Sequence, residues 1–520
     1  MMKSHQLLSL LLHATYCNPL ALPSNPQISL GLPSGFQTDH DYIDIGTKFA
    51  QRKPRRIAII GSGITGSTAA FTIAEAGRLD PFGPPSITLF ERNPIIGGRI
   101  TTTQIYRDPR FTIDTCAATF STLSDTCLAT SATNVGLLTR IVTPSDAGTG
   151  VWDGTEFRGF VEDTGFRNPQ TWSLFRKLRW FQRYGATPWE YARNVTSTQT
   201  RYRQLGTAMF TSLRAAVKAV DLEKAVRLGV CESGLLDCTQ YGNSLFLQEV
   251  VDAGIRERFF GNVDELNGLD AILGFSGDTL SEIVGGNLRL VDRLIKLSGA
   301  DLRLSTTVAK IKKQPQGVWR LYFSTPTVSD SIDFDAVVIA APLSTSDLAF
   351  EPELGSRPGL LLPYVDSFVT HFTTTSNLSS SYFKVDGPVP QNILTTGIGT
   401  NHPLPFFQLR LVGRYSNPKP VEAENLYKLV SEQPVTDDEL GEYLELDVGP
   451  PTKPVISWIS REPLFDSVPR LDANQTLLGD VEVEPGLFYA GAGEQVTATV
   501  EFGCRMGRNV ARLAFPGGSQ

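Results

Sequence analysis

The stretch from residue 56 to residue 99 contains every part of a dinucleotide-binding unit, in the required order. A short apolar run, Ile57–Ile60, predicts a buried parallel strand. In such units the first glycine after the strand allows a tight turn, the second lets a pyrophosphate approach, and the third lets the next helix pack closely. The helix N-terminus then favours phosphate. The glycines fit the pattern G-x-G-x-x-G, at Gly61, Gly63 and Gly66.

An acidic residue follows the second strand of this unit. Ile87–Phe90 predicts that strand, and Glu91 comes directly after it. Its carboxylate can accept hydrogen bonds from both ribose hydroxyls of an adenosine, and its charge disfavours a 2′-phosphate. Ser62 and Thr65 in the glycine turn, and Arg92 after the acid, are expected to contact the dinucleotide as well.

A second glycine motif indicates which dinucleotide is bound. Gly97, Gly98 and Arg99 follow Glu91 with the spacing E-x(5)-G-G-R. This pattern resembles the extended motif of the large FAD-dependent oxidoreductases of the amine-oxidase type, in which the loop passes the pyrophosphate. The resemblance implies FAD as the cofactor, with Gly98 beside it and Arg99 free to meet a phosphate. No Cys or His has a setting that compels a flavin linkage, so noncovalent binding is expected.

Later segments complete a flavin fold that is discontinuous in sequence. In FAD proteins that this chain resembles, the segment around Val308 lies along the adenine, and a turn such as Gly493-Glu494 approaches the flavin. The helix after that turn would point its N-terminus at the flavin ring. An ordinary strand, turn and helix that closes a domain would show the same pattern. The predicted strands and final helix lie within Leu302–Ile311, Phe334–Ala341, Gly486–Gly493 and Val500–Leu513.

These segments predict an α/β fold with two domains. A Rossmann-like FAD-binding domain of the amine-oxidase kind would combine residues 54–130, 281–345 and 470–515. An α+β substrate-binding domain would take residues 131–280 and 346–469. The chain has 520 residues, of which 41% are hydrophobic, so it can bury enough core for both domains.

The predicted substrate-binding domain contains an aromatic-rich stretch, Asn168–Tyr202, whose pattern is largely helical with a break at Pro188. Its side chains could line an apolar pocket or pack as ordinary core, and both alternatives remain open. A later segment, Phe350–Trp458, is richer in Val, Thr and Phe and predicts a mixed sheet. The apolar residues of the first stretch are Trp172, Phe175, Leu178, Trp180, Phe181, Tyr184, Trp189 and Tyr191.

The N-terminus and three sequons bear on localisation. Residues 1–22 combine a basic start, the apolar run Leu7–Leu12 and a Pro-containing end, which predicts a secretory signal peptide. The alternative is a disordered tail on a cytosolic protein. N-glycosylation sequons at Asn194, Asn377 and Asn474 fit passage through the secretory pathway. We therefore expect a vacuole-like, lysosome-like or extracellular location.

Charge and cysteine content exclude some classes of protein. The net charge of −7 argues against a nucleic-acid or anionic-membrane partner, and the N-terminal apolar run is too short to span a membrane. Six cysteines are too few for a disulfide scaffold. Cys231 and Cys238 are close enough in sequence to bridge a loop, and Cys116 and Cys127 could do the same. Neither pair has metal-site spacing and histidines are scarce, so no metal is expected.

Several segments after about Lys53 occur in the same order in one family. They begin at Trp180 (WFQRYG), Phe260 (FGN), Gly285 (GGN), Phe334 (FDAVVIAAPL), Ile393 (ILTT) and Gly493 (GE, leading to Glu501). The chain thereby resembles the prenylcysteine oxidases, also called prenylcysteine lyases. The resemblance implies an FAD enzyme that uses O2 to oxidise the allylic carbon next to sulfur in S-prenyl cysteine, giving cysteine, a prenyl aldehyde and hydrogen peroxide. No side chain is assigned as catalytic.

Two segments depart from that family. Its members have a glycine-rich stretch with an acid where this chain has Ile113–Ala118, and Ile283–Asn287 lacks the acid that directly precedes the paired glycines. The substrate is therefore an S-prenyl cysteine or another allylic or prenylated small molecule of a specialised-metabolite pathway. A non-catalytic flavin-binding protein is the third alternative, and the intact set of nucleotide-binding residues argues against it.

Overall fold

The computed structural model describes residues 55–116, 119–121, 126–142, 148–158, 173–274, 280–355, 360–415, 423–445, 456–471 and 478–516. These residues belong to one compact unit, Lys53–Gln520. The predicted signal peptide at 1–22, Trp172 and the sequon at Asn474 lie outside the described residues. No described helix has both the length and the apolar character that crossing a bilayer requires.

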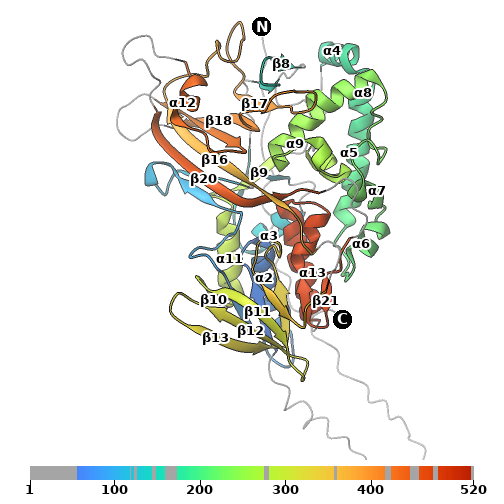
Figure 1. Ribbon diagram of the computed structural model, residues 1–520, viewed down its shortest axis with the longest axis vertical. Helices are drawn as coiled ribbons and strands as arrows, with labels where there is room; N and C mark the ends of the chain where they lie inside the picture. The colour runs from blue at the N-terminus through green and yellow to red at the C-terminus, as the bar shows by residue number, and fades with distance from the viewer. Residues whose placement is uncertain are drawn as a thin grey trace, which may run out of the picture. The chain divides into compact units, whose positions relative to one another are not determined.

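A six-stranded, mostly parallel sheet contains the predicted dinucleotide unit (Figure 1). Ile57 is in register with Ile87 on one side and with Ala336 on the other. Parallel strands that are covered on both faces are apolar throughout, and Ile57–Ile59 are fully buried. The predicted α/β fold is therefore confirmed. In spatial order the strands are β10 (Asp301–Arg303), β2 (Ser86–Phe90), β1 (Arg56–Ile60), β14 (Ala336–Ile339), β22 (Leu487–Tyr489) and β21 (Glu482–Glu484).

Helix α2 (Ile64–Gly77) follows the glycine turn and packs against α11 (Leu288–Ser298) and α13 (Val500–Ala514) (Figure 1). The close approach of α13 depends on a missing side chain, because a Cβ atom at Gly507 would overlap the carbonyl oxygen of Thr65. The predicted final helix is confirmed, and it lies directly against the helix of the dinucleotide unit.

The segment Leu302–Ile311 forms two strands that belong to different sheets. β10 ends at Arg303, Ser305 adopts φ +48, and β11 (Thr307–Lys313) enters a four-stranded sheet. A positive φ at a non-glycine residue redirects the chain within one residue, which apolar patterning cannot reveal. The order of the second sheet is β13 (Ser329–Phe334), β12 (Trp319–Ser324), β11 and β15 (Ala349–Glu351).

A seven-stranded mixed sheet confirms the prediction for Phe350–Trp458. β17 and β7 pair in parallel, and the other neighbours are antiparallel. Alternate residues face opposite sides of such a sheet, and one face packs Phe372 and Tyr427 against Leu440 of helix α12 (Asp437–Glu442). The strand order is β20 (Ile456–Pro469), β16 (Tyr364–Thr374), β19 (Glu424–Ser431), β18 (Gln408–Tyr415), β17 (Asn392–Thr395), β7 (Thr149–Trp152) and β8 (Phe157–Arg158).

The six-stranded sheet takes all its strands from the three stretches assigned to an FAD-binding domain, and the seven-stranded sheet takes its strands from the other two. The division into domains itself stays a prediction. Two small sheets complete the strands: β3 (Thr102–Gln104) with β4 (Thr112–Asp114), and β5 (Phe120–Ser121), β9 (Leu280–Ile283) and β6 (Thr139–Ile141).

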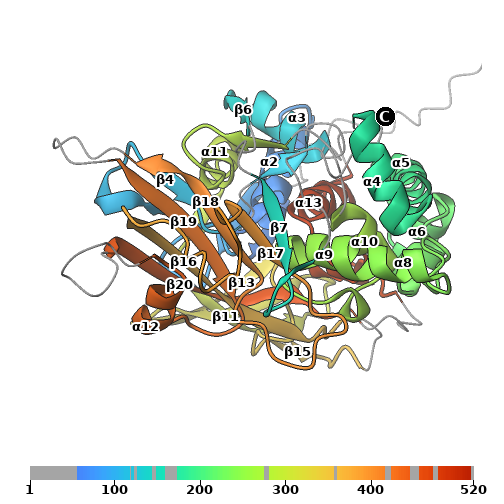
Figure 2. The same cartoon turned by 90° about the horizontal axis from the view of Figure 1, so that it is seen from above.

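Helices α4, α5 and α8 group apart from strands β16 and β20 in two perpendicular views (Figures 1 and 2). The described part of the stretch Asn168–Tyr202 is helical and broken as predicted, because Pro188 occupies the start of α5, where it costs no hydrogen bond. The helices are α3 (Thr126–Asn134), α4 (Leu174–Tyr184), α5 (Thr187–Gln204), α6 (Leu213–Ala219), α7 (Glu223–Arg227), α8 (Tyr241–Phe246), α9 (Asp252–Phe259) and α10 (Gly268–Gly274), with a π-helical turn at Leu247–Val251 and 3₁₀ turns at Ile105–Arg107, Val263–Glu265 and Ala490–Gln495.

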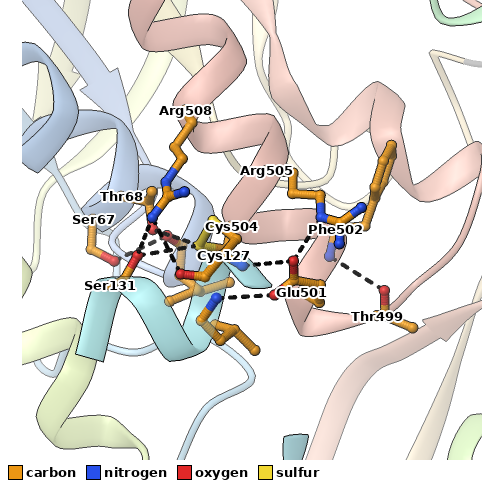
Figure 3. Close-up of a disulfide and its surroundings, with 12 residues drawn as sticks. Ser67, Thr68, Cys127, Ser131, Thr499, Glu501, Phe502, Cys504, Arg505 and Arg508 are labelled. Carbon is orange, nitrogen blue, oxygen red and sulfur yellow. Dashed lines mark hydrogen bonds and ion pairs between the residues drawn. A yellow bond between two sulfur atoms is a disulfide. The ribbon is translucent and has the colours of Figure 1, made fainter. Parts of the chain in front are cut away.

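Two disulfides join described cysteines, and one of them differs from the expected pairing. Cys231 pairs with Cys238, as the sequence spacing predicts. Cys127 pairs with Cys504, 377 residues away, so a Cys116–Cys127 bridge is wrong (Figure 3). Helix α13 packs against α3, which brings together two residues that no sequence interval relates. Cys116 is an unpaired, partly buried thiol.

Candidate cofactor and substrate site

A cavity of about 1400 Å³ connects the dinucleotide unit with the seven-stranded sheet. Every residue predicted to hold FAD lines this cavity except Gly66, which lies behind the glycine turn. Their contacts with FAD stay predictions, but the structure brings them together from distant parts of the chain. The residues that line the cavity are Gly61, Ser62, Gly63, Thr65, Glu91, Arg92, Gly98, Arg99, Val308, Gly493 and Glu494.

The glycine turn has the backbone that its motif requires. Gly61 has φ +102, and a Cβ atom there would lie 2.9 Å from the carbonyl oxygen of Ala340. A Cβ atom at Gly66 would overlap the carbonyl oxygen of Gly61, so the third glycine permits close helix packing. Gly63 differs, because a Cβ atom there would meet only the carbonyl oxygen of Gly97, at 3.7 Å. Its absent side chain leaves room for a ligand in the cavity.

Helix α2 begins without a side-chain cap. Gly63 is its N-cap residue, so no side chain at that position accepts a hydrogen bond from the first turn. The amide N–H groups of this turn are therefore available to an anion, and the helix dipole adds attraction. An uncapped helix N-terminus beside a bare glycine turn fits the pyrophosphate of a dinucleotide.

Glu91 lies at the end of β2 and braces the glycine turn. One carboxylate oxygen accepts hydrogen bonds from Ser62 N at 2.9 Å and from Ser62 Oγ at 2.7 Å, and the other accepts one from Asn93 N at 2.9 Å. A carboxylate can accept about four hydrogen bonds, so capacity remains for a ribose hydroxyl. Arg92 is exposed and donates to the carbonyl oxygen of Thr345 at 3.3 Å.

The motif predicted that Arg99 would be free to meet a phosphate, but the side chain forms an ion pair with Glu494. The guanidinium also donates to Ser467 O at 3.4 Å, and Glu494 accepts a hydrogen bond from Tyr364 Oη at 2.6 Å. Burial alone lowers the pKa of Arg99, but the charge and hydrogen bonds of Glu494 raise it above its usual value. Arg99 is partly buried, and the carboxylate compensates for part of the hydration that its guanidinium loses. The pair ties the G-G-R loop to the turn before α13.

Val308, Gly98 and Gly493 shape the wall between these groups. Val308 lies in β11 and is 8% exposed. Gly98 has φ +57 and continues the loop in which Gly97 forms a bridge with Gly63. A Cβ atom at Gly493 would overlap Met506 of α13, so this glycine lets the turn reach the helix.

Glu501 lies in the first turn of α13 and carries a buried charge. In the sequence it appeared only as the end of the segment that begins at Gly493, with no role assigned. Its carboxylate accepts hydrogen bonds from Cys127 N at 2.9 Å, Leu128 N at 3.0 Å and Arg505 Nε at 2.6 Å (Figure 3). Glu501 is 2% exposed, and the three donors compensate for lost water. It therefore fixes α3 to the start of α13 at the cavity wall, where the disulfide from Cys504 joins the same helices.

Asp114 supplies an acid next to the paired glycines, where the segment Ile283–Asn287 itself lacks one. Its carboxylate accepts hydrogen bonds from Asn287 N at 3.0 Å and from Thr102 Oγ1 at 2.8 Å. Burial raises the pKa of Asp114 to about 6. Asp114 lies in Ile113–Ala118, so the two segments that depart from the family pattern meet here, which sequence alone does not show.

The seven-stranded sheet contributes polar residues that the sequence analysis did not select. His371, Arg410, Lys428 and Glu462 all line the cavity. The sequence does contain a sign of these residues, because Arg410 and Lys428 are charged residues that each interrupt an apolar stretch of a strand. Without the strand register, however, nothing in the sequence places them side by side.

Only part of the aromatic stretch belongs to the core, because Phe175, Leu178 and Phe181 are each more than half exposed. Trp180, Tyr184 and Tyr191 are at most 1% exposed and contact other core side chains. Of the described residues 173–202, only Tyr202 lines the cavity. The structure thus favours core packing over the pocket alternative.

The donor set of the cavity fits FAD and does not resemble a metal centre. Among the described residues, no group of three or more His, Cys, Asp or Glu side chains is placed to hold a metal ion. The uncapped helix and the bare glycine turn would hold the phosphates and Glu91 the ribose, and the start of α13 lines the same cavity.

Two family models match the chain. The model described as prenylcysteine lyase matches residues 168–517, which is more than half of the sequence. The model described as an NAD(P)-binding Rossmann-like domain matches residues 59–130. A curated relative, farnesylcysteine lyase of Arabidopsis thaliana, is 25% identical over 478 residues, which cover 88% of this chain and 88% of the relative.

Solved structures of amine oxidases share the fold. Cyclohexylamine oxidase from Brevibacterium oxydans IH-35A is 17% identical with a TM-score of 0.55, over 89% of this chain and 99% of that one. Putrescine oxidase bound to putrescine is 14% identical with a TM-score of 0.51, over 88% and 98%. The cofactor motifs, the cavity and these matches identify an FAD-dependent oxidoreductase, and the chain belongs to the prenylcysteine lyase family.

Proposed function

We propose that this protein is an oxidase that uses FAD and O2 to oxidise the allylic carbon next to sulfur in an S-prenyl cysteine. The products would be cysteine, a prenyl aldehyde and hydrogen peroxide. The cavity carries the proposal, because it joins the FAD-binding residues to a sheet face that bears both apolar and charged side chains. A substrate with a long apolar chain and a small charged head needs both. The relative named farnesylcysteine lyase supports this substrate class.

The substrate carries much of the chemistry. FAD, when bound, supplies the acceptor for a hydride and passes the two electrons to O2. The sulfur lone pair and the alkene stabilise the positive charge that develops on the allylic carbon. Water adds to that carbon, and the resulting thiohemiacetal breaks into a thiol and an aldehyde. The protein is left with positioning the carbon and excluding other water.

Apolar residues of the seven-stranded sheet meet the first of these tasks. Leu426, Val430 and Leu464 line the cavity and would hold the isoprenoid chain. The Arg99–Glu494 pair and Tyr364 would close the cavity wall between the G-G-R loop and the turn before α13. Hydride loss from such a carbon needs no strong base, so the absence of an assigned catalytic side chain does not count against the proposal.

A second candidate is oxidation of another allylic or prenylated small molecule in a specialised-metabolite pathway. The observation that favours it is the setting of the paired glycines, which no acid directly precedes and where Asn287 N donates to Asp114 of the second departing segment. Both departing segments line the cavity, whereas the motif residues predicted to bind FAD are all present. No structural observation favours a non-catalytic flavin-binding protein.

Anaerobic mixing of the purified yellow protein with S-farnesylcysteine is expected to bleach the flavin absorption band. Each bleached flavin should be accompanied by one farnesal, and admission of air should restore the band and release an equal amount of hydrogen peroxide, because each turnover moves two electrons. Stopped-flow absorbance, a peroxide assay and mass spectrometry of the aldehyde measure the three quantities. S-farnesylcysteine that leaves the flavin oxidised would exclude this substrate, and bleaching by another prenylated thioether or allylic compound would support the second candidate.

We further propose that the protein passes through the secretory pathway. Its two disulfides support this location, because disulfides persist in oxidising compartments and are rare in the cytosol. The predicted signal peptide at 1–22 and the sequons give independent support from the sequence.

Expression through a secretory route is expected to place a glycan on Asn377 and none on Asn194. Asn377 is exposed, whereas Asn194 lies within α5 and its Nδ2 donates to Leu235 O at 2.9 Å. A glycan on Asn194 would replace an N–H of that amide and crowd the helix surface. Glycopeptide mass spectrometry checks both sites, with Asn377→Gln as the control that should remove the signal. Modification of Asn194 would contradict the prediction.

A further inference from the structure

Three basic side chains lie next to one another on the cavity face of the seven-stranded sheet. His371 of β16 is in register with Lys428 of β19, and Lys428 is in register with Arg410 of β18. Direct cross-strand neighbours have Cβ atoms about 5 Å apart on the same face. All three residues line the cavity. We call this set the basic row.

The basic row is costly without a partner. Among the described residues, no carboxylate forms an ion pair with Arg410, and burial lowers the pKa of its guanidinium. Lys428 Nζ donates to Thr115 O at 2.7 Å, and burial together with Arg410 lowers its pKa. His371 is 0% exposed, and neither ring nitrogen has a hydrogen-bond partner. Two desolvated cations and an unsatisfied imidazole at one cavity wall indicate an anionic ligand.

The acids near the basic row already have partners. Glu282 pairs with Arg140 at 2.5 Å, and Glu462 accepts a hydrogen bond from Thr115 Oγ1 at 2.8 Å. Asp114 accepts hydrogen bonds from the glycine segment, as described above. These carboxylates are therefore held by other donors, and the guanidinium of Arg410 keeps its paired N–H groups for an incoming group.

We propose that Arg410 and Lys428 bind the carboxylate of an amino-acid thioether substrate, with Arg410 as the principal ligand. A guanidinium presents parallel N–H groups that match the two oxygens of a carboxylate, and a neighbouring ammonium adds charge. Val412 and Leu426 lie two residues from Arg410 and Lys428 and also line the cavity, so the apolar chain can extend along the same face. This inference rests on the proposed function and names the headgroup that the site selects.

The test compares S-farnesylcysteine with S-farnesylcysteamine, which is the same thioether without the carboxylate. For the wild-type holoenzyme, the KM for the cysteamine derivative is expected to be about 10- to 100-fold higher, as for loss of a charged hydrogen-bonded pair. Arg410→Gln should bring the ratio of the two KM values close to one. Arg410→Lys, which keeps the charge but not the planar fork, should give an intermediate ratio.

Arg461→Gln is the matched control. Arg461 is a cation of β20 in the same sheet that donates to Val435 O at 2.9 Å and pairs with Asp437, outside the cavity lining. The substitution Arg461→Gln removes one positive charge from the sheet and should leave the KM ratio at the wild-type value.

Other outcomes overturn the assignment. A wild-type ratio near one, or a ratio that persists in Arg410→Gln, would exclude a carboxylate ligand. A loss of FAD content or a changed flavin spectrum in Arg410→Gln, with the ratio preserved, would show that the arginine serves the flavin. If neither thioether is oxidised, the proposed function fails, and calorimetric titration of the holoenzyme with both compounds then tests the carboxylate site. Preferential binding of S-farnesylcysteine that Arg410→Gln abolishes would still support the site. Equal binding of the two compounds, or no binding, would refute it.

Discussion

Replacing Gly63 with aspartate is expected to give a folded protein that contains no FAD. Gly63 has φ −69 and ψ −173, which other residues adopt readily, and a Cβ atom there meets nothing closer than 3.7 Å. Aspartate is also a favourable N-cap residue, so it should accept hydrogen bonds from the first turn of α2. The substitution therefore takes away the donors that a pyrophosphate needs and places a negative charge beside it. We expect FAD binding to weaken by about 100-fold or more.

Two further variants at the same position separate charge from size. Gly63→Ala adds a methyl group alone and should keep most of the flavin, whereas Gly63→Asn has the size and capping ability of aspartate without its charge. The flavin content should fall in the order glycine, alanine, asparagine, aspartate. The ratio of flavin to protein absorbance measures it, and circular dichroism establishes that each variant is folded. A yellow aspartate variant with the wild-type ratio would disprove the assignment of the phosphate loop.

The dinucleotide unit could be predicted from the sequence because its determinants are local. Gly61 needs a positive φ and Gly66 needs a missing side chain, and both requirements act within a few residues of the turn that they form. The apolar strand Ile57–Ile60 and the acid Glu91 complete the unit within 35 residues of chain. Residue types in such a pattern follow from the local backbone conformation, which is why the α/β fold and its first strands and helix were predicted correctly.

The partners of the site residues could not be predicted, because they depend on packing between distant segments. Arg99 and Glu494 were each placed near the flavin, but their separation of 395 residues concealed that they neutralise each other. The basic row needs the register of three strands, since a shift of one residue would turn Lys428 into the opposite, apolar face. Side-chain chemistry indicates which groups need partners, and only the fold supplies them.

The aromatic stretch shows the same limit for burial. Trp180 and Tyr191 occupy helical positions that would suit either a pocket or a core. Which alternative holds depends on what covers each side chain: other core residues cover Trp180 and Tyr191, whereas Phe181 stays more than half exposed. The buried residues of the stretch therefore contribute to the stability of the unit rather than to the lining of the cavity.

Removing the Cys127–Cys504 disulfide is expected to destabilise the protein more than removing Cys231–Cys238. A disulfide restricts the unfolded chain in proportion to the logarithm of the loop that it closes. The first closes 377 residues and the second closes 7. The chain-entropy relation then gives about 6 kcal/mol for the first bridge and about 2 kcal/mol for the second. The first bridge also joins α3 to α13, whose initial turn forms the cavity wall (Figure 3).

The double variants Cys127→Ala/Cys504→Ala and Cys231→Ala/Cys238→Ala test this difference. Both should fold, because Glu501 still holds Cys127 N and Leu128 N of the first pair's helices through its carboxylate, and those bonds need no sulfur. Urea unfolding of the holoprotein, followed by flavin fluorescence and circular dichroism, gives the free energies of unfolding. A difference of about 4 kcal/mol is expected, with flavin released at lower urea in the first variant. Equal losses would show that α13 is held at the cavity by its packing and by Glu501, and that the long-range bridge adds nothing to the cofactor site.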